Sequence, residues 1–463
     1  MSNQPNVVFI LSDDQGAWAL GCYGNTEIRT PNLDRLAARG VRFGNFFCTS
    51  PVCSPARASL LTGKIPSQHG VHDWIKDGNV GERPVEYLAG HTAYTEILAA
   101  NGYHCGMSGK WHLGHSALPQ KGFSHWFVHQ SGGSPYVNAP MIRNGQLVEE
   151  PGYITDVITD DALEYIEERA KEDRPFYVSV HYTAPHSPWI GQHPQHYVDL
   201  YENCPFDSCP QEPKHPWSTF DQLEPTVFTE PREHLKGYYA AITAMDDHIG
   251  RILDRLDSLD LTDHTLVCFL SDNGFSCGQR GIWGKGNGTF PLNMFDSSVR
   301  VPAIMSHPGR IPEGLVCDEL LSGYDFMPTL LDYLGFDYPE SERLPGRSFL
   351  PLLLGQPSEG REGVVIYDEY GPVRMVRTKT WKYIHRYPYG PHELYDLVSD
   401  PGERDNLIDD QSKEDVLRSM RAMLDDWFHQ YVDPAKDGAR EPVAGGGQTG
   451  LSGLAGRGRQ AFE

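Results

Sequence analysis

A cysteine at the start of a short predicted helix is the first residue whose surroundings suggest chemistry. In the string CSPARASLLTG, Ser54 can cap a helix, Pro55 suits its first turn and Gly63 can end it. Cys53 would then lie beside the free amides of a helix N-terminus, where an anion is favoured. Arg57 adds a fixed positive charge one turn later. An isolated cysteine is usually a buried thiol, but here a reactive group and an anion site coincide.

Oxygen-bearing side chains follow two predicted buried strands. They are Asp13, Asp14, Asp272 and Asn273. The first two come after the apolar run 6–11 and the others after the run 265–270, and the carboxyl ends of strands in an open α/β sheet line its ligand crevice. Three carboxylates would repel one another there unless a cation lay among them. Hard oxygen donors favour Ca²⁺, with Mg²⁺ as the alternative, over zinc or copper.

Basic side chains also follow predicted strands. Lys110 and His112 lie in a glycine-flanked loop, and His186 lies between two prolines that stiffen its loop. Taken singly, each is more often a solvated lysine or a core histidine. Their shared position after strands favours a site in which histidine moves a proton and lysine stabilises an anion.

The cysteine string, Cys-x-Pro-x-Arg followed by Ala-Ser-Leu-Leu-Thr-Gly, resembles the signature of the type I sulfatases, which have an alkaline-phosphatase-like fold. The resemblance extends over most of the chain, including TPNLD at 30–34 and ELYDL at 393–397. It implies that a formylglycine-generating maturation enzyme oxidises Cys53 to formylglycine (3-oxoalanine), the catalytic aldehyde. It also implies that Asp13, Asp14, Asp272, Asn273 and the modified Cys53 bind Ca²⁺, and that Arg57, Lys110, His112 and His186 are the sulfate-binding and acid/base residues.

The resemblance also implies a mechanism. A hydroxyl of the hydrated aldehyde attacks sulfur while Arg57, Lys110 and the cation hold the sulfate oxygens. His186, with a second lysine, protonates the departing alcohol, and His112 then removes a proton so that sulfate leaves and the aldehyde returns.

Two positions depart from the family pattern. Lys285 in GKGNGT is the candidate for the second lysine, but the aromatic-acid pair that often follows it comes late, at Phe295 and Asp296. Many relatives have a histidine before the glycine that is Gly281 here, and this chain has Arg280. The difference bears on substrate specificity. We therefore include Arg280 among the candidate substrate-binding residues.

Aromatic and polar residues near these motifs are candidates for a sugar-binding pocket. They are His72, Asp73, Trp74 and Trp189. Each is as compatible with packing as with stacking on a sugar.

Strands and helices alternate through most of the chain, which predicts an α/β domain with a large, mostly parallel sheet flanked by helices over residues 1–355. Short alternating strands and one helix predict a smaller C-terminal subdomain with an antiparallel sheet over 356–440. Glycine and serine dominate residues 441–463, where we expect a flexible tail that packs little.

The 463-residue chain has a formal charge of −23 and no basic run, which argues against a nucleic-acid partner. No apolar run is long enough to span a bilayer, and no signal peptide precedes the first strand. We expect a cytoplasmic protein, or a secreted or periplasmic one if a leader has been removed. The oligomeric state is not predicted.

Three functions compete. The leading hypothesis is a sulfatase acting on a sulfate monoester of a small molecule or oligosaccharide, with a carbohydrate sulfate favoured. The same site could instead hydrolyse phosphonate or phosphate monoesters, or the protein could bind sulfated glycans without catalysis. Ser276 in Gly-Phe-Ser-Cys-Gly fits the nucleophile elbow of serine hydrolases, but the glycine-rich sequence after it disfavours the required helix.

Overall fold

The computed structural model describes residues 4–338, 343–456 and 461–462. Its main feature is a ten-stranded sheet in the order β13-β2-β12-β9-β1-β8-β4-β5-β6-β7. The strands are β1 (Asn6–Ser12), β2 (Val41–Phe43), β4 (His104–Gly109), β5 (His125–His129), β6 (Val137–Arg143), β7 (Gln146–Tyr153), β8 (Phe176–His181), β9 (Thr265–Ser271), β12 (Ala303–Ser306) and β13 (Leu315–Cys317). The five central strands, from β9 to β5, are parallel, whereas β12 and the β6–β7 hairpin run antiparallel to their neighbours. The predicted α/β class is confirmed.

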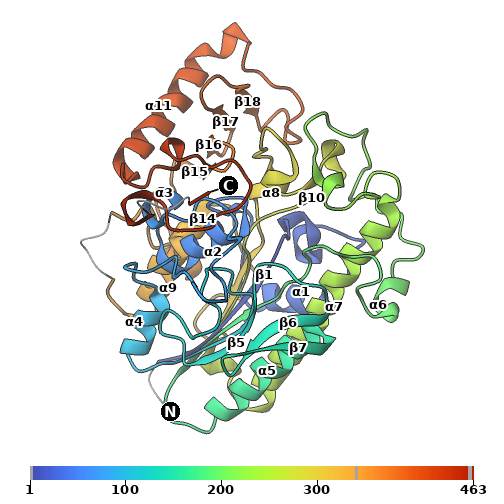
Figure 1. The fold of residues 1–463 in the computed structure, drawn as a ribbon, viewed down its shortest axis with the longest axis vertical. Coiled ribbons are helices and arrows are strands. Elements are labelled where there is room, and N and C mark those ends of the chain that lie inside the picture. The colour runs from blue at the N-terminus through green and yellow to red at the C-terminus, as the bar shows by residue number, and fades with distance from the viewer. Residues whose placement is uncertain (1–3, 339–342, 457–460, 463) are drawn as a thin grey trace.

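Helices cover both faces of this sheet (Figure 1). The helices of the first domain are α1 (Pro31–Ala38), α2 (Cys53–Thr62), α3 (Pro66–His69), α4 (Tyr94–Ala100), α5 (Ile154–Arg169), α6 (Gln195–Asp199), α7 (Pro231–Ser258), α8 (Asp296–Val299), α9 (Phe326–Leu334) and α10 (Leu350–Leu353). Alternate residues of β1 enter opposite cores: Phe9 packs with α2, α4 and α9, and Ile10 packs with α1, α5 and α7. A central strand buried on both faces explains the continuous apolar run in the sequence.

The C-terminal subdomain is a four-stranded antiparallel sheet with one helix, as predicted. Its elements are β15 (Gly363–Asp368), β16 (Val373–Thr378), β17 (Trp381–Arg386), β18 (Glu393–Asp396) and α11 (Glu414–Tyr431). Val365 and Tyr367 face α11, whereas Val364 and Ile366 join the core beside the large sheet. The small sheet is therefore fixed to the first domain by its second apolar face. Two-stranded sheets pair β3 (Phe46–Phe47) with β14 (Leu321–Ser322) and β10 (Ser276–Cys277) with β11 (Trp283–Gly284).

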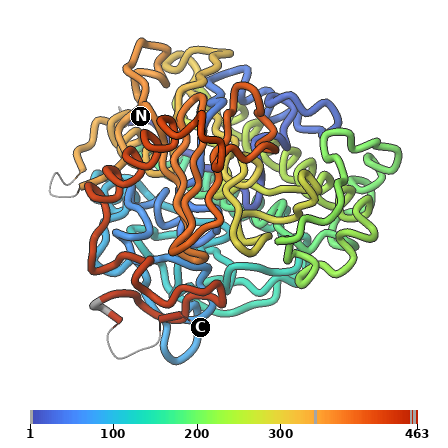
Figure 2. Tube along the Cα trace, turned by 90° about the horizontal axis from the view of Figure 1, so that it is seen from above, coloured from blue at the N-terminus to red at the C-terminus, as the bar shows by residue number. Residues whose placement is uncertain are grey.

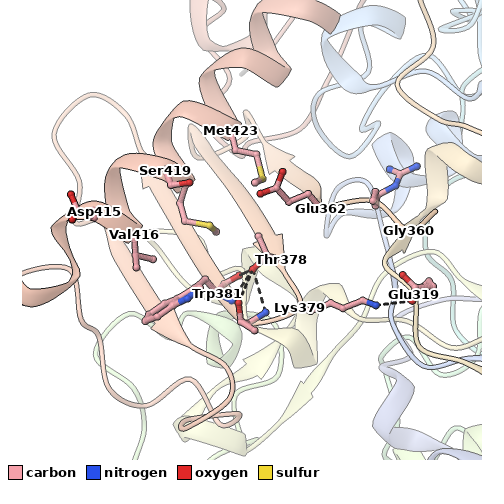
Figure 3. A pocket seen from close by; sticks show the side chains of 13 residues that line it. Glu319, Gly360, Glu362, Thr378, Lys379, Trp381, Asp415, Val416, Ser419 and Met423 are labelled. Atoms are coloured by element: carbon pink, nitrogen blue, oxygen red, sulfur yellow. Dashed lines mark hydrogen bonds and ion pairs between the residues drawn. The ribbon is translucent and has the colours of Figure 1, made fainter.

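A groove of about 860 Å³ runs between α11 and the β16–β17 turn (Figure 3). Trp381, Met420 and Met423 line it together with charged side chains such as Glu362 and Lys379. None of the predicted site residues lies there. In the described ranges, no helix combines the length and apolar character needed to cross a membrane.

The expectation that residues 441–463 pack little is wrong for the part of this segment that the structure describes. Val443 and Phe462 are buried, and Gln448 has no exposed surface. Figure 2 shows the C-terminal segment beside a loop of the first domain that is drawn in blue. A parallel β-bridge joins Gln448 to Ile75. Composition misled the prediction because hydrogen bonds of Gln448 and a few separated apolar residues, not a continuous apolar run, hold this segment.

Candidate active site

The two acidic motifs meet where parallel neighbours β1 and β9 end. Ser12 is in register with Ser271, and the backbone N–H of Asp272 donates to the Ser12 carbonyl at 3.1 Å. Asn273 Nδ2 donates to Oδ1 of Asp14 at 2.7 Å. The predicted convergence of these side chains is therefore present in the structure.

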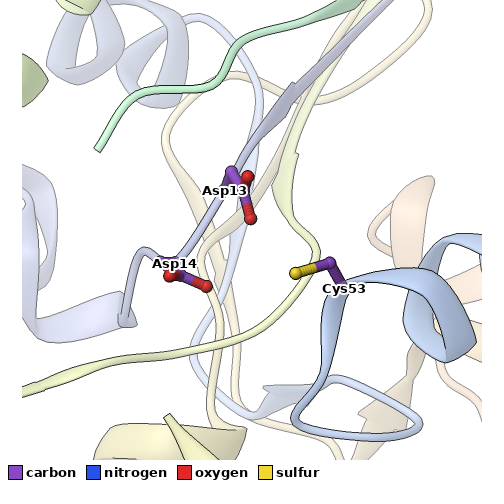
Figure 4. A group of neighbouring side chains, drawn as sticks. All are labelled: Asp13, Asp14 and Cys53. Carbon is purple, nitrogen blue, oxygen red and sulfur yellow. The ribbon is translucent and has the colours of Figure 1, made fainter. Parts of the chain in front are cut away.

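Helix α2 brings the cysteine to the same place. Cys53 is the first residue of α2, and its Sγ lies within 4.8 Å of a carboxylate oxygen of Asp13 and of Asp14 (Figure 4). The prediction that Ser54 caps the helix is wrong. The N-cap residue is Val52, and its side chain makes no capping hydrogen bond. Ser54 Oγ instead donates to the His112 carbonyl at 3.0 Å, because the loop of His112 passes over the first turn of α2.

The oxygen donors of this cluster fit a hard cation. Asp13 Oδ1 and Asn273 Oδ1 are buried and have no hydrogen-bond partner among the described residues. Buried polar atoms are nearly always paired, so two acceptors that are free to bind, beside further carboxylates, fit a cation site. Both Ca²⁺ and Mg²⁺ fit such a donor set.

Two lysines lie against these carboxylates. Lys110 Nζ donates to Oδ2 of Asp13. Lys285 Nζ lies 2.6 Å from Oδ1 of Asp14 and 2.9 Å from Sγ of Cys53. Burial lowers the pKa of Lys285, but nearby acidic groups, above all the Asp14 carboxylate, hold that pKa well above its ordinary value. Lys285, predicted as the second lysine, therefore belongs to the cluster as a cation.

The acidic groups of the cluster differ in their pKa values. Burial raises the pKa of Asp13, but Lys110 and the other nearby cations hold it well below its usual range. Burial and the charge of Asp13 raise the pKa of Asp272 to about 7. Burial also raises the pKa of the Cys53 thiol, and the nearby lysines only partly oppose this effect. Cys53 is thus a poor thiolate nucleophile as it stands.

Arg57 is held by hydrogen bonds of its Nε and Nη1 and keeps its Nη2 unused. Its Nε donates to Oδ2 of Asp272 and its Nη1 donates to the Lys110 carbonyl, both at 2.8 Å. Its Nη2 is buried without a partner among the described residues. An oriented guanidinium with an unused N–H can bind an anion without reorganising.

Each of the two candidate acid/base histidines, His112 and His186, has one nitrogen hydrogen-bonded to a backbone carbonyl. His112 Nε2 donates to the Ile75 carbonyl at 3.0 Å, which leaves the buried Nδ1 unpartnered in the described structure and able to accept a proton. Burial, together with Lys110, holds the pKa of His112 well below its ordinary value. His186 Nδ1 donates to the Ser187 carbonyl at 2.6 Å, and its Nε2 lies 3.7 Å from Oδ2 of Asp14.

Gly132 supports the site and was not among the residues predicted from the sequence. A Cβ atom there would lie 2.1 Å from the ring of His112, so only glycine allows the close approach of this loop. In the sequence, the Gly-Gly pair at 132–133, just after β5, could have indicated a close approach of another segment.

The prediction that Trp189 contacts a sugar is wrong. Its side chain is 1% exposed and packs among aromatic rings that include Tyr238, Phe275 and Trp283. An enclosed ring cannot stack on a sugar. Arg280 donates to the Gly402 carbonyl and to Ser297 Oγ, and its guanidinium lies over the ring of Phe295. Arg280 therefore joins the C-terminal subdomain to the first domain.

The other three candidates, His72, Asp73 and Trp74, lie together in the stretch that leads to Ile75. His72 and Asp73 are buried, and Trp74 is half-buried. The Asp73 carboxylate accepts hydrogen bonds from the backbone of Trp74 and Gly447. Burial raises the pKa of Asp73 to about 7. A direct contact of these residues with substrate stays a prediction.

The chain matches two family models. Residues 5–336 match the sulfatase model, and residues 290–430 match the C-terminal model of N-sulphoglucosamine sulphohydrolase.

An N-acetylglucosamine-6-O-sulfatase of Bacteroides thetaiotaomicron is 27% identical over 94% of this chain and 88% of its own length. An ulvan-active sulfatase of Formosa agariphila is 33% identical over 94% of this chain and 83% of its own. A solved structure in complex with its substrate D-glucosamine-2-N,6-O-disulfate superposes with a TM-score of 0.80 at 25% identity, covering 95% of this chain and 100% of that one. The chain belongs to the sulfatase family.

Proposed function

We propose that this protein hydrolyses sulfate monoesters of carbohydrates, using a formylglycine made from Cys53 and a divalent cation, with Ca²⁺ expected. One observation carries the proposal. Sγ of Cys53 and carboxylate oxygens of Asp13 and Asp14 lie within 4.8 Å of one another, where the central strands β1 and β9 end. When present, the hydrated aldehyde and the cation would supply a nucleophilic oxygen and a Lewis acid.

The side chains around that point have the properties that sulfate transfer needs. The unused Nη2 of Arg57 and the ammonium of Lys110 can bind the sulfate oxygens. Lys285 adds a third positive charge beside the nucleophile position. Fixed donors in a buried site stabilise developing anionic charge more strongly than water does.

Proton transfer falls to the two histidines. His186 Nε2 lies beside Asp14 of the cluster, and 21% of the His186 side chain is exposed. His186 can therefore protonate the departing alcohol. His112 Nδ1 is buried and can accept a proton from the nucleophile position. Burial holds the pKa of His112 well below its ordinary value, so this imidazole is neutral, as the acceptor of a proton must be.

The relatives suggest the first substrates to test. One relative is an N-acetylglucosamine-6-O-sulfatase, and one structural neighbour binds a glucosamine disulfate as its substrate. We therefore propose a 6-O-sulfated amino sugar as the starting point. Because Cys53 is 4% exposed, we propose that the maturation enzyme acts on this segment before the chain folds.

The test compares protein made with and without a formylglycine-generating enzyme. The mass of the tryptic peptide from Phe43 to Arg57 reports conversion of Cys53, and ion chromatography measures sulfate released from sulfated sugars. Sulfate release only by the converted protein supports the proposal. If a phosphonate monoester were hydrolysed orders of magnitude faster than a sulfate monoester with the same leaving group, phosphonate hydrolysis would be the favoured activity. Binding of sulfated sugar without release would favour a non-catalytic protein.

A further inference from the structure

The C-terminal segment pairs with a loop that leads into the candidate active site. Gln448 forms a parallel bridge with Ile75. The backbone N–H of Gln448 donates to the Trp74 carbonyl at 2.8 Å, and its carbonyl accepts from the N–H of Lys76 at 2.9 Å. The stretch 72–76 therefore gains a strand-like partner from the far end of the chain.

The side chain of Gln448 makes this attachment specific. Its Oε1 accepts from the backbone N–H of His72 at 3.0 Å and of Asp73 at 3.4 Å. Its Nε2 donates to the carbonyls of Gly70 and Gly450, at 2.9 and 3.0 Å. A buried amide whose two ends are both satisfied cannot be replaced by a carboxylate or a methyl group without loss of hydrogen bonds.

Asp73 makes a second attachment between the same segments. Its Oδ2 accepts from the N–H of Gly447 at 3.1 Å, and its Oδ1 accepts from the N–H of Trp74 at 2.7 Å. Gly447 has φ = 105°, a backbone conformation that favours glycine. The glycine-rich composition of the segment thus serves a defined turn.

Ile75 connects this assembly to His112. The Ile75 carbonyl accepts from His112 Nε2 at 3.0 Å, and the Ile75 N–H donates to Ser54 Oγ at 3.1 Å. Ser54 Oγ donates in turn to the His112 carbonyl. Both backbone groups of Ile75 therefore help to hold His112 against the first turn of α2.

His112 depends on such support. Its φ of 54° lies in the left-handed region, which costs a non-glycine residue free energy and persists only where the surroundings impose it. Gly132 packs on its ring, and Ile75 fixes Nε2 as the protonated nitrogen. A shift of the Ile75 carbonyl would change both the position of the ring and the nitrogen that carries the lone pair.

We propose that Gln448 is a positioning residue for His112, acting through the stretch 72–76, so that the C-terminal segment completes the active site. The expected kinetic effect rests on the proposed sulfatase function, because it assigns proton acceptance to Nδ1 of His112. Gln448 itself contacts neither the acidic cluster nor Cys53 in any hydrogen bond of the described structure.

The first experiment does not depend on activity. Amide hydrogen exchange of the unconverted protein is compared between wild type, Gln448→Ala and the control Gln411→Ala, which alters an exposed glutamine. Gln448→Ala should speed exchange at His72, Asp73 and Lys76 by at least tenfold while the amides of β1 and β9 keep their protection. Unchanged exchange over 72–76 would overturn the proposal. Gln448→Glu, which keeps the acceptor and loses the donor, gives the same comparison if the alanine variant does not fold.

The second experiment uses a double-mutant cycle in the converted enzyme. Gln448→Ala should lower kcat about 10- to 100-fold with KM within about threefold, as expected for a displaced catalytic group. In a His112→Ala background the same change should have less than a threefold effect. Equal losses in both backgrounds would contradict a role through His112. If wild-type enzyme releases no sulfate, the proposed function fails, while the exchange experiment still decides whether Gln448 orders the 72–76 stretch.

Discussion

Lys285 Nζ lies 2.9 Å from Sγ of Cys53 although 232 residues separate the two in the chain. The same ammonium lies 2.6 Å from Oδ1 of Asp14. Lys285 therefore bridges the nucleophile position and a proposed cation ligand. The structure brings it there through the loop that follows β11.

This bridge predicts the effect of removing the charge. Lys285→Ala in the converted enzyme should lower kcat by about 10²- to 10³-fold, the usual cost of losing one fixed donor at a developing anion. Lys379→Ala, which alters a surface lysine in the C-terminal subdomain, is the control and should leave kcat unchanged. A kcat within threefold of wild type for Lys285→Ala would remove Lys285 from the catalytic residues.

Arg57→Lys should be damaging although it keeps the charge. The three donors of a lysine lie on one nitrogen and cannot span Asp272, the Lys110 carbonyl and an anion as the planar guanidinium can. We expect kcat/KM for a sulfated sugar to fall by at least about 10²-fold, measured by sulfate release. Arg418→Lys, on the exposed side of α11, is the matched control. Full activity of Arg57→Lys would show that geometry at this position is unimportant.

Binding of a cation should stabilise the folded protein. At a free Ca²⁺ concentration of 100 Kd, linkage adds about 2.7 kcal/mol to the free energy of unfolding. Thermal melts of the unconverted protein with Ca²⁺, Mg²⁺ or EDTA measure this. Asp13→Asn should abolish the rise in Tm, since it removes a ligand charge from the cluster. An equal rise in wild type and variant would place the cation elsewhere.

Acid should destabilise the protein in part through His193. Burial lowers the pKa of His193 to about 3, against 6.5 for an ordinary histidine, so the unfolded chain binds the extra proton between these values. Stability contributed by the neutral ring is therefore complete above pH 6.5 and is lost as the pH falls, by about 1.4 kcal/mol per pH unit.

Urea unfolding at pH 6 and pH 5 tests this dependence. His193→Gln should reduce the loss of unfolding free energy between the two pH values by about 1.2 kcal/mol. The exposed His429, replaced by glutamine, serves as the control. The same loss in His193→Gln as in wild type would contradict the assignment.

The sequence predicted the parts of the site that depend on short local patterns. Asp13 and Asp272 follow apolar runs that become adjacent parallel strands, so their meeting followed from strand polarity alone. The cysteine signature likewise predicted α2 and its N-terminal thiol.

Features that depend on distant partners were not predictable in this way. Trp189 next to the His186 loop has the same local sequence whether it is exposed or enclosed, and only tertiary packing encloses it. Ser54 had a second partner in the His112 carbonyl, which outcompeted capping. The segment around Gln448 is ordered by backbone groups 370 or more residues away, which composition does not encode.

The most direct test of the account is sulfate release from N-acetylglucosamine-6-sulfate, measured for converted wild-type enzyme beside Cys53→Ala produced in the same way. We predict steady release of inorganic sulfate by the wild type, with one alcohol formed per sulfate, and none above background by Cys53→Ala. If Cys53→Ala released sulfate at the wild-type rate, the chemistry would not run through Cys53, and the central claim would be contradicted.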